Sequence, residues 1–155
     1  QMAEHVDFEN ASILEIGCGF GSFFKLGFHC KHYVGFDVNE NFINIAKQTY
    51  NTVGWYTSMP DPRELFDVCI CSGVAGNRGG PAWNPALLQK FLSDTYSRCT
   101  QKVLINFPTN RADIRSEHVE YFSPEYVLGQ ALQITHNVTL IHKHKFDFLL
   151  ILEHD

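Results

Sequence analysis

Three alternating glycines, Gly17, Gly19 and Gly21, directly follow a short apolar run and suggest a ligand-binding turn. The run, residues 13–16, is rich in β-branched side chains and predicts a buried parallel strand over about 12–16. Glycine permits a tight turn and a close approach of the backbone to a ligand, because it has no Cβ atom. The next residues predict a helix over about 22–29. We therefore expect free backbone N–H groups and the positive end of a helix dipole to face a polar or anionic ligand.

An acidic residue, Asp37, follows Gly17 by twenty residues and ends a second predicted strand over about 33–37. A carboxylate in that position can accept hydrogen bonds from both hydroxyl groups of a ribose. The fingerprint of dinucleotide-binding proteins, G-x-G-x-x-G, would need glycine or alanine where Ser22 stands. The pattern therefore favours a nucleoside-containing ligand and disfavours a nicotinamide dinucleotide.

Two segments, E-I-G-C-G-F-G (residues 15–21) and V-G-F-D-V (residues 34–38), resemble the first two motifs of the class I S-adenosylmethionine-dependent methyltransferases. The resemblance implies that S-adenosyl-L-methionine is the cofactor. It implies that Glu15 holds the methionine ammonium group, directly or through water, and that Asp37 accepts the 2′- and 3′-hydroxyls. Val38 would pack on the adenine. The backbone is expected to run close to the methionine and ribose parts of the cofactor at Gly17, Cys18, Gly19 and Gly21.

Each of these residues also has an ordinary structural alternative. The glycines can form a plain strand-to-helix turn, and Glu15 can be a structural carboxylate. Asp37 can cap the next helix, which we expect over about 39–50 with Asn39 among its cap residues. The ligand-binding role and the structural role of each residue would require different geometries of the turn.

The third and fourth motifs of the family are less clear in this chain. Many relatives carry an acid after the third strand, where it receives the adenine amino group, but Ser58 and Met59 stand there and Asp61 lies beyond. Ser58 can accept from the amine and Met59 can lie on the ring, or Asp61 can swing in. Ser72 matches the position that meets the transferable methyl group. Because C-S-G-V (residues 71–74) replaces the D/N-P-P-Y/F/W motif, methylation of exocyclic base amines is disfavoured.

Strands and helices alternate along most of the chain, which predicts a parallel, doubly wound sheet. The third crossover helix should be reduced to a loop, because prolines interrupt residues 59–62. The last two strands have no helix between them and should pair antiparallel. We therefore expect an α/β, Rossmann-like, seven-stranded sheet that is mostly parallel and has a C-terminal antiparallel hairpin. The remaining strands are expected over about 54–58, 66–71, 102–107, 138–141 and 146–152, and the remaining helices over about 85–98 and from 123 onward.

Composition restricts the class of protein further. The 155 residues suffice for one domain with a buried core, and the formal net charge of −5 disfavours a nucleic-acid partner. No stretch approaches the roughly 18 consecutive apolar residues of a membrane span. The five cysteines lack a C-x-x-C pair and no signal peptide is visible, so we expect reduced thiols and a cytoplasmic location. Residues 1–155 should form a single class I methyltransferase domain, which either lacks the N-terminal helix of many relatives or is cut from a longer chain.

Methyl transfer to an oxygen nucleophile usually needs a general base. The candidates are His144, His118 and Tyr121, together with Asp113, all on predicted loops. Each histidine can equally be a solvated surface residue. No metal site is expected, because His142 and His144 have no evident third ligand.

The sequence thus predicts an S-adenosylmethionine-dependent methyltransferase that acts on a hydroxyl group of a small molecule or a sugar. One alternative is a catalytically silent S-adenosylmethionine-binding domain that serves as a partner subunit, and another is an RNA or protein methyltransferase. Near the substrate, Arg78, Gly79 and Gly80 can form an anion-binding rim and Trp83 can stack on a ring, or this loop can be a lid without specific contacts. The oligomeric state is not predicted.

Overall fold

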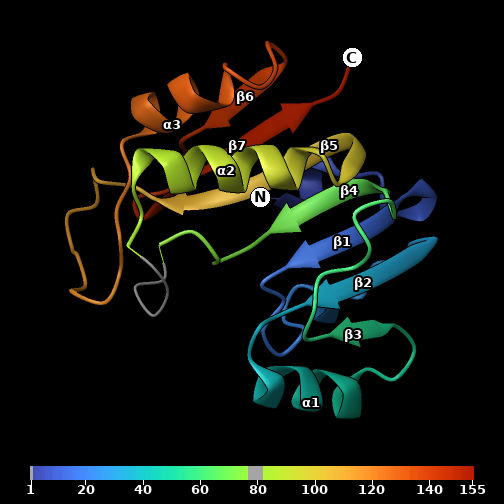
Figure 1. Ribbon diagram of the computed structural model, residues 1–155. Coiled ribbons are helices and arrows are strands. Elements are labelled where there is room, and N and C mark those ends of the chain that lie inside the picture. Colours follow the sequence, from blue (N-terminus) through green and yellow to red (C-terminus); the bar gives the residue numbers. More distant parts are fainter. Residues whose placement is uncertain (1, 77–81) are drawn as a thin grey trace.

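The structure, a computed structural model, describes residues 2–76 and 82–155 and is built on one seven-stranded sheet (Figure 1). The strand order is β3-β2-β1-β4-β5-β7-β6. The strands are β1 (Ser12–Ile16), β2 (His32–Phe36), β3 (Gly54–Tyr56), β4 (Phe66–Cys71), β5 (Cys99–Pro108), β6 (Val138–Ile141) and β7 (Asp147–Glu153). The fold predicted from the sequence is confirmed, although β3 is shorter than expected.

The pairing of the strands follows the predicted pattern. β1 pairs in parallel with both β2 and β4, while β2 pairs with β3 and β4 with β5 in the same sense. β7 lies between β5 and β6 and is antiparallel to both. The carboxyl ends of β1, β2 and β4 therefore meet at one edge of the sheet, which is where ligands of open α/β sheets bind.

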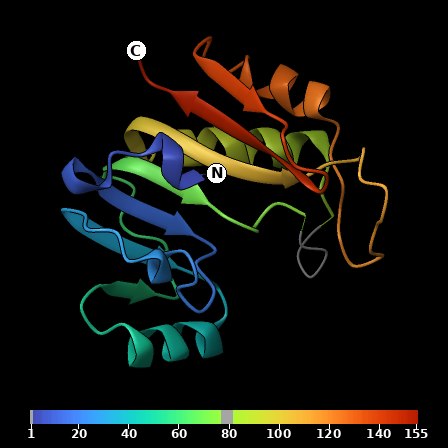
Figure 2. The ribbon, with the colours of Figure 1, turned by 180° about the vertical axis from the view of Figure 1, so that it is seen from behind.

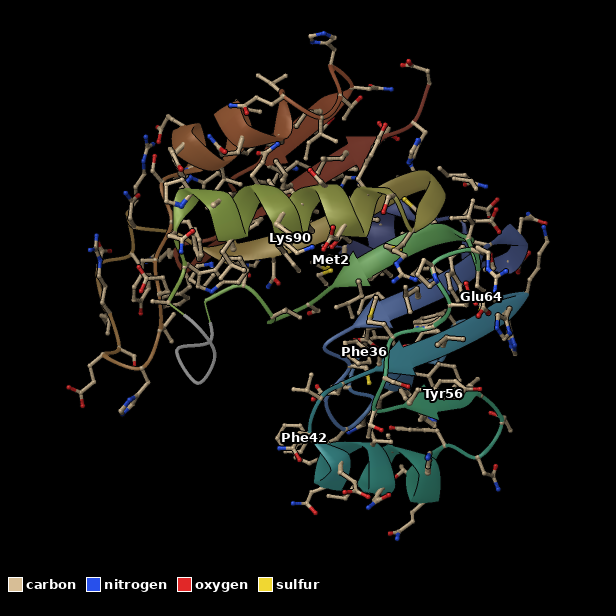
Figure 3. All side chains as sticks on the ribbon, in the orientation of Figure 1. Met2, Phe36, Phe42, Tyr56, Glu64 and Lys90 are labelled. Carbon is tan, nitrogen blue, oxygen red and sulfur yellow. The ribbon has the colours of Figure 1, made fainter. Side chains whose placement is uncertain are left out.

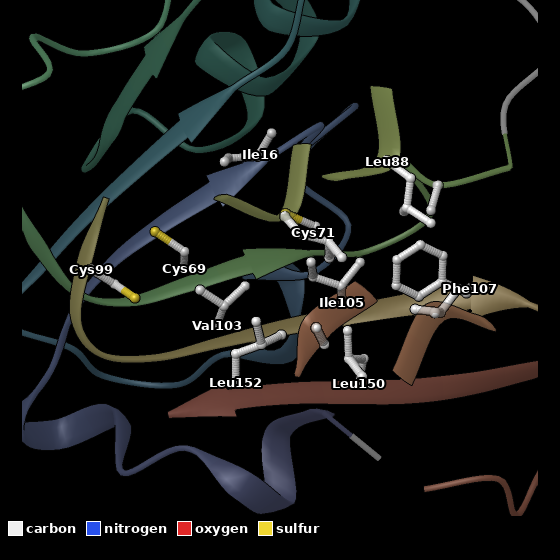
Figure 4. Packing of buried hydrophobic residues seen from close by; sticks show 14 of the residues in the cluster. Ile16, Cys69, Cys71, Leu88, Cys99, Val103, Ile105, Phe107, Leu150 and Leu152 are labelled. Atoms are coloured by element: carbon white, nitrogen blue, oxygen red, sulfur yellow. The ribbon is translucent and has the colours of Figure 1, made fainter. Parts of the chain in front are cut away.

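Helices cover the two faces of the sheet unequally. The α2 (Pro85–Tyr96) and α3 (Pro124–Ala131) helices lie on one face, where Leu88 and Val127 join side chains of β4, β5 and β7 in a continuous core (Figures 1 and 4). The other face carries α1 (Glu40–Thr49) near β3, and the N-terminal segment with its short 3₁₀ turns η1 (Met2–His5) and η2 (Phe8–Asn10) lies across the sheet (Figure 2). Within the described ranges, no helix has the length and apolar content needed to cross a bilayer.

The prediction of a helix over about 22–29 is wrong. Its place is taken by turns and one 3₁₀ helix, η3 (Phe24–Leu26), which ends at Gly27 in the left-handed region with φ of 76°. The glycines at 21 and 27 leave only a short segment, and its phenylalanines pack on other aromatic rings instead of forming a helical face. Phe24 contacts Tyr33 with ring centroids 4.8 Å apart, and Phe28 stacks on Phe8 at 4.0 Å. Tertiary packing of the rings therefore overrides the local tendency to form a helix.

The third crossover helix is absent, as predicted, since residues 57–65 form a loop between β3 and β4. Arg98, just beyond α2, holds this loop by donating from Nη1 to the carbonyl oxygen of Pro60 at 2.8 Å. A cleft of about 410 Å³ remains between the loop and α2, and Ile16, Met59, Pro62 and Phe91 are among its lining residues.

Candidate cofactor site

The glycine turn after β1 has the backbone geometry that only glycine adopts readily. Gly17, Gly19 and Gly21 have φ angles of 72°, 53° and 79°, all in the left-handed region. At Gly17 a Cβ atom would also stand 2.2 Å from Cγ2 of Val74 in the segment that follows β4. The turn is therefore shaped both by its own dihedral angles and by close contact with the end of β4.

The amide groups of this turn are largely satisfied within the protein. Gly17 and Cys18 both donate their N–H groups to the carbonyl oxygen of Phe36, at 2.7 and 3.0 Å, and Gly21 donates to Cys18 at 2.9 Å. The expectation that these groups would face a ligand is wrong, and the helix that was expected to follow the turn and to direct its dipole at the ligand does not form. Side chains and the shape of the turn are therefore what this edge of the sheet can offer to a ligand.

Asp37 joins the end of β2 to the glycine turn. Its Oδ2 accepts from the backbone N–H of Gly19 and its Oδ1 from that of Asn39, both at 2.9 Å. The cap of α1 is Asn39, whose side chain accepts from the N–H of Asn41 at 3.0 Å, so the alternative role of Asp37 as the helix cap is wrong. A carboxylate offers about four lone-pair positions, so each oxygen of Asp37 can accept a further hydrogen bond.

Two adjacent hollows lie at this edge of the sheet and share Gly17 and Gly19. The first, of about 340 Å³, contains Asp37. The second, of about 330 Å³, contains Glu15. Other residues of the first hollow are Ile16, Phe36, Val38, Phe42, Gly73 and Val74, and those of the second are Cys18, Phe20, Ser22, Phe23, Leu26 and Ser72. We call the two hollows together the edge groove.

Glu15 is buried at the base of the second hollow, with only 2% of its surface exposed. Burial raises the pKa of its carboxyl group to about 7, and the charge of Asp37 adds to this rise. The hydroxyl of Tyr33 lowers the same pKa, because it donates a hydrogen bond to Oε2. The thiol of Cys18 has its pKa raised to about 12 by burial and by the charges of Glu15 and Asp37. The thiol of Cys18 is therefore uncharged, whereas the carboxyl group of Glu15 can titrate near pH 7.

Apolar side chains form the outer wall of the first hollow. Val38 is 82% exposed, and Phe36 and Phe42 lie on β2 and α1 at the same end of the sheet (Figure 3). The ring of Phe42 contacts that of Phe20 from the glycine turn, with centroids 4.3 Å apart. An exposed valine beside aromatic rings offers a surface on which a flat apolar ring can pack.

The residues predicted to meet the adenine amine lie elsewhere. Ser58 is exposed and is not among the lining residues of the edge groove. Met59 packs against the core beneath α2 and lines the neighbouring cleft with Ile16. Asp61 is held on the exposed loop by Arg63, whose Nη2 donates to Oδ2 at 2.7 Å. Of the described residues that line that cleft, Ile16 is the one that also lines the edge groove.

The three candidate bases are dispersed. His118 lies on the exposed loop before α3, and His144 lies in the exposed turn between β6 and β7. That turn is two to three strand positions from β4 in the sheet order, or about 10–14 Å. Tyr121 is half-buried and its Oη accepts from the N–H of Ser116 at 2.7 Å. In the parts of the chain that the structure describes, no group of three possible metal ligands comes together.

Asn106 near the end of β5 is a candidate site residue to which the sequence analysis assigned no role. Its Oδ1 accepts from the N–H of Gly73 at 2.8 Å, and its Nδ2 donates to Oδ2 of Asp147 at 3.2 Å. The amide thereby ties the segment after β4, which lines the edge groove, to the first residue of β7. A polar residue within the apolar run of residues 103–107 was the available signal. The anion-binding rim proposed for Arg78, Gly79 and Gly80 lies outside the described residues.

A model of the methyltransferase domain family matches residues 14–83, which include the glycine turn, Asp37 and the segment after β4. Together with the strand order and the terminal antiparallel hairpin, this match defines a Rossmann-like methyltransferase domain. The matched residues contain both motifs by which the sequence resembles the class I S-adenosylmethionine-dependent methyltransferases, and S-adenosylmethionine is the cofactor of that family. Among curated protein sequences, none matches the chain significantly.

Solved structures of several methyltransferases resemble the whole chain. Magnesium protoporphyrin IX methyltransferase (ChlM) from Synechocystis PCC 6803 with bound SAM has 15% identity and a TM-score of 0.73, with 99% of this chain and 74% of that chain covered. A SAM-dependent methyltransferase from Aquifex aeolicus has 18% identity and a TM-score of 0.74, covering 98% and 86%. The N-methyltransferase NodS from Bradyrhizobium japonicum WM9 has 20% identity and a TM-score of 0.68, covering 94% and 86%. At these identities the likeness establishes the fold.

Proposed function

We propose that this protein transfers the methyl group of S-adenosylmethionine to a hydroxyl group of a small molecule or a sugar. The observation that carries the proposal is the placement of two carboxylates, Glu15 and Asp37, in the two halves of the edge groove on either side of Gly17 and Gly19. A cofactor with a cationic amino acid at one end and a ribose at the other matches this arrangement. The single sheet supports a single domain for cofactor and acceptor.

In this proposal each half of the groove takes one half of the cofactor. Glu15 would bind the methionine ammonium, and Asp37, while keeping its bonds to Gly19 and Asn39, would accept from the ribose hydroxyls. Val38 would cover the adenine, and Ser72 would lie beside the methionine part because it shares the hollow with Glu15. The predicted adenine contacts of Ser58 and Met59 have no support from the geometry.

The reaction itself is an in-line displacement. The acceptor oxygen attacks the methyl carbon, the carbon–sulfur bond breaks, S-adenosylhomocysteine leaves, and the hydroxyl proton passes to a base. Tyr121 lines a pocket at this edge of the sheet, whereas His118 and His144 are exposed on loops, and we therefore propose Tyr121 for that role. The net charge of −5 supports a small uncharged acceptor over RNA.

Calorimetric titration with S-adenosylmethionine and S-adenosylhomocysteine tests the cofactor site. Asp37→Ala should weaken binding by about a hundredfold, since it removes two hydrogen bonds to a charged group at about 1.5 kcal/mol or more each. Asp61→Ala is the matched control, because that carboxylate is exposed and paired with Arg63, and it should bind normally. Undiminished binding by a folded Asp37→Ala variant would refute the assignment.

Methyl transfer to acceptors tests the reaction. A tritiated methyl donor should label a small hydroxyl compound, and Tyr121→Phe should lower kcat by about a hundredfold if the phenol acts as the base. Cofactor binding without labelling of any small molecule, sugar, protein or RNA would instead support the catalytically silent partner domain. Labelling of RNA that weakens steeply with salt would support the nucleic-acid alternative.

A further inference from the structure

One side of the sheet ends in an unprotected edge strand, β6, whose inner neighbour is β7 (Figure 1). No other described strand pairs with it. An edge strand presents a row of unpaired backbone groups to solvent, and natural proteins usually interrupt such a row with lysine, proline or a β-bulge. The sequence V-T-L-I of β6 contains no charged residue and no proline, and its register with β7 runs without a shift. β6 therefore lacks these protective features.

The outer strand on the other side of the sheet, β3, is protected. It has only three residues, one of which is Gly54, and the loop that follows it contains Pro60 and Pro62. A short strand followed by prolines offers little backbone with which another strand can pair. α1 also packs beside β3. The two edges therefore differ, and β6 is the one suited to accept a further strand.

The pairing of β6 with β7 determines which of its backbone groups are free. The N–H of Glu153 donates to the carbonyl oxygen of Asn137 at 2.9 Å, so these opposite residues form a pair of the hydrogen-bonded kind. In an antiparallel ladder, hydrogen-bonded and non-hydrogen-bonded pairs alternate. Every second residue from Asn137 therefore directs its backbone groups to β7, whereas Val138 and Leu140 direct theirs to the outer side.

These outward groups are complementary to those of an identical strand. When two copies of β6 run antiparallel about a twofold axis through Thr139, Val138 of one copy stands opposite Leu140 of the other. The two residues can then exchange both of their backbone hydrogen bonds. The same register sets Thr139 opposite Thr139 of the second copy, and threonine pairs across two strands are favourable. The edge of β6 is thus complementary to itself.

The side chains of β6 fit the same arrangement. Val138 and Leu140 are half-buried and pack against the core on the face that carries α2 and α3, while Thr139 is exposed. Twofold pairing of the edges keeps both copies of α3 on one face of the joined sheet. Val138 and Leu140 of the two copies then lie side by side, and the apolar core continues from one copy into the other.

We propose that β6 is the surface through which two copies of this chain associate, edge to edge, so that their sheets become continuous. The edge groove lies at β1, β2 and β4, away from β6 in the strand order, so each copy keeps its groove open. Two paired strands of four residues make a small contact, and interfaces below about 1,200 Å² are usually weak. We therefore expect a reversible dimer with a dissociation constant of about 100 µM. The association needs no cofactor and is independent of the proposed function.

Sedimentation velocity at pH 8 measures the association over concentrations of about 10 to 500 µM. The sedimentation coefficient of the wild type should rise with concentration toward that of a dimer. Thr139→Lys should weaken self-association about tenfold, because it sets two like charges opposite each other on the twofold axis. Thr57→Lys is the matched control, since it makes the same change at an exposed threonine directly after β3, and it should associate like the wild type.

A pair of opposite charges tests the register. Thr139→Asp alone should also associate more weakly than the wild type, whereas an equimolar mixture of Thr139→Asp and Thr139→Lys should regain the dimer, because the two side chains attract across the axis. Because Thr139 is exposed, both variants should keep the thermal unfolding curve of the wild type. A wild type that stays monomeric throughout, undiminished association of Thr139→Lys, equal weakening by Thr57→Lys, or a mixture that fails to dimerise would overturn the proposal.

Discussion

Replacing Glu15 by glutamine should make the protein more stable above neutral pH. The carboxyl group is buried and has a pKa of about 7, against 4.5 for a glutamate carboxyl group in the unfolded chain. Between these two pH values the folded state holds a proton that the unfolded state has lost. The stability of the wild-type protein therefore falls as the pH rises from about 4.5 to 7. Glutamine keeps an acceptor for the Tyr33 hydroxyl and removes the ionisation.

The size of this effect follows from the difference between the two pKa values. At about 1.4 kcal/mol per unit, the full penalty on ionised Glu15 is about 3 kcal/mol. Most of it develops between pH 5 and 8. The free energy of unfolding of Glu15→Gln should therefore exceed that of the wild type by about 2 to 3 kcal/mol more at pH 8 than at pH 5.

Urea denaturation at pH 5, 6, 7 and 8 measures this difference directly. Because the two proteins differ at position 15 alone, the difference between their free energies of unfolding isolates that position. Glu64→Gln, which changes an exposed acid on the loop before β4, should show a constant difference over the same range (Figure 3). A difference for Glu15→Gln that does not change with pH would refute the proposed burial penalty.

Glu15 also couples cofactor binding to protons. If the ionised carboxylate holds the methionine ammonium, binding below pH 7 must release a proton, so affinity should rise with pH up to about 7 and then level off. Calorimetry in buffers of different ionisation enthalpy measures the proton, and Glu15→Gln should bind more weakly and release none.

Two further predictions concern the segment after β4. Gly76→Ala should destabilise the protein by about 2 kcal/mol or more, because φ at Gly76 is +96° and the new Cβ would meet Pro108. Gly73→Ala should cost only about 1 kcal/mol, because φ is +77° but no atom lies within 4 Å of the new Cβ. Thermal unfolding compares the two, and equal losses would contradict the packing argument. Asn106→Ala should cost about 1 to 3 kcal/mol by leaving Gly73 and Asp147 without their shared partner, and should weaken S-adenosylhomocysteine binding severalfold by calorimetry. Wild-type stability and affinity would show that the tie between the strands has no consequence.

The strands were predictable because their signal is local. Buried parallel strands are short apolar runs, and β1, β4 and β6 have the predicted bounds. The absence of a helix between β1 and β2 could not be predicted in the same way. The residues near Phe24 and Phe28 have neighbours from η2, β2 and β3, and these contacts between distant segments decide the local conformation.

The candidate site likewise has features that the sequence predicts and features that it does not. Glu15, Asp37 and the glycines are placed by the ends of strands, so spacing along the chain sufficed to bring them to one edge. The acceptor of the Gly17 and Cys18 amides is the carbonyl of Phe36, and backbone partners of that kind leave no mark in the sequence. A pocket of about 220 Å³ is lined by residues from the ranges 83–88 and 120–126, which the packing of α2 against the segment before α3 brings together.

The position of β7 has a consequence for how the molecule assembles. This strand, formed by the most C-terminal residues of the sheet, is inserted between β5 and β6, so β6 has no described strand partner until Asp147–Glu153 has left the ribosome. During synthesis the half of the sheet from β1 to β5 can form first, with one bare edge on β5 exposed to other chains. Pairing of β7 with β5 closes that edge, and it also brings Asp147 to Asn106.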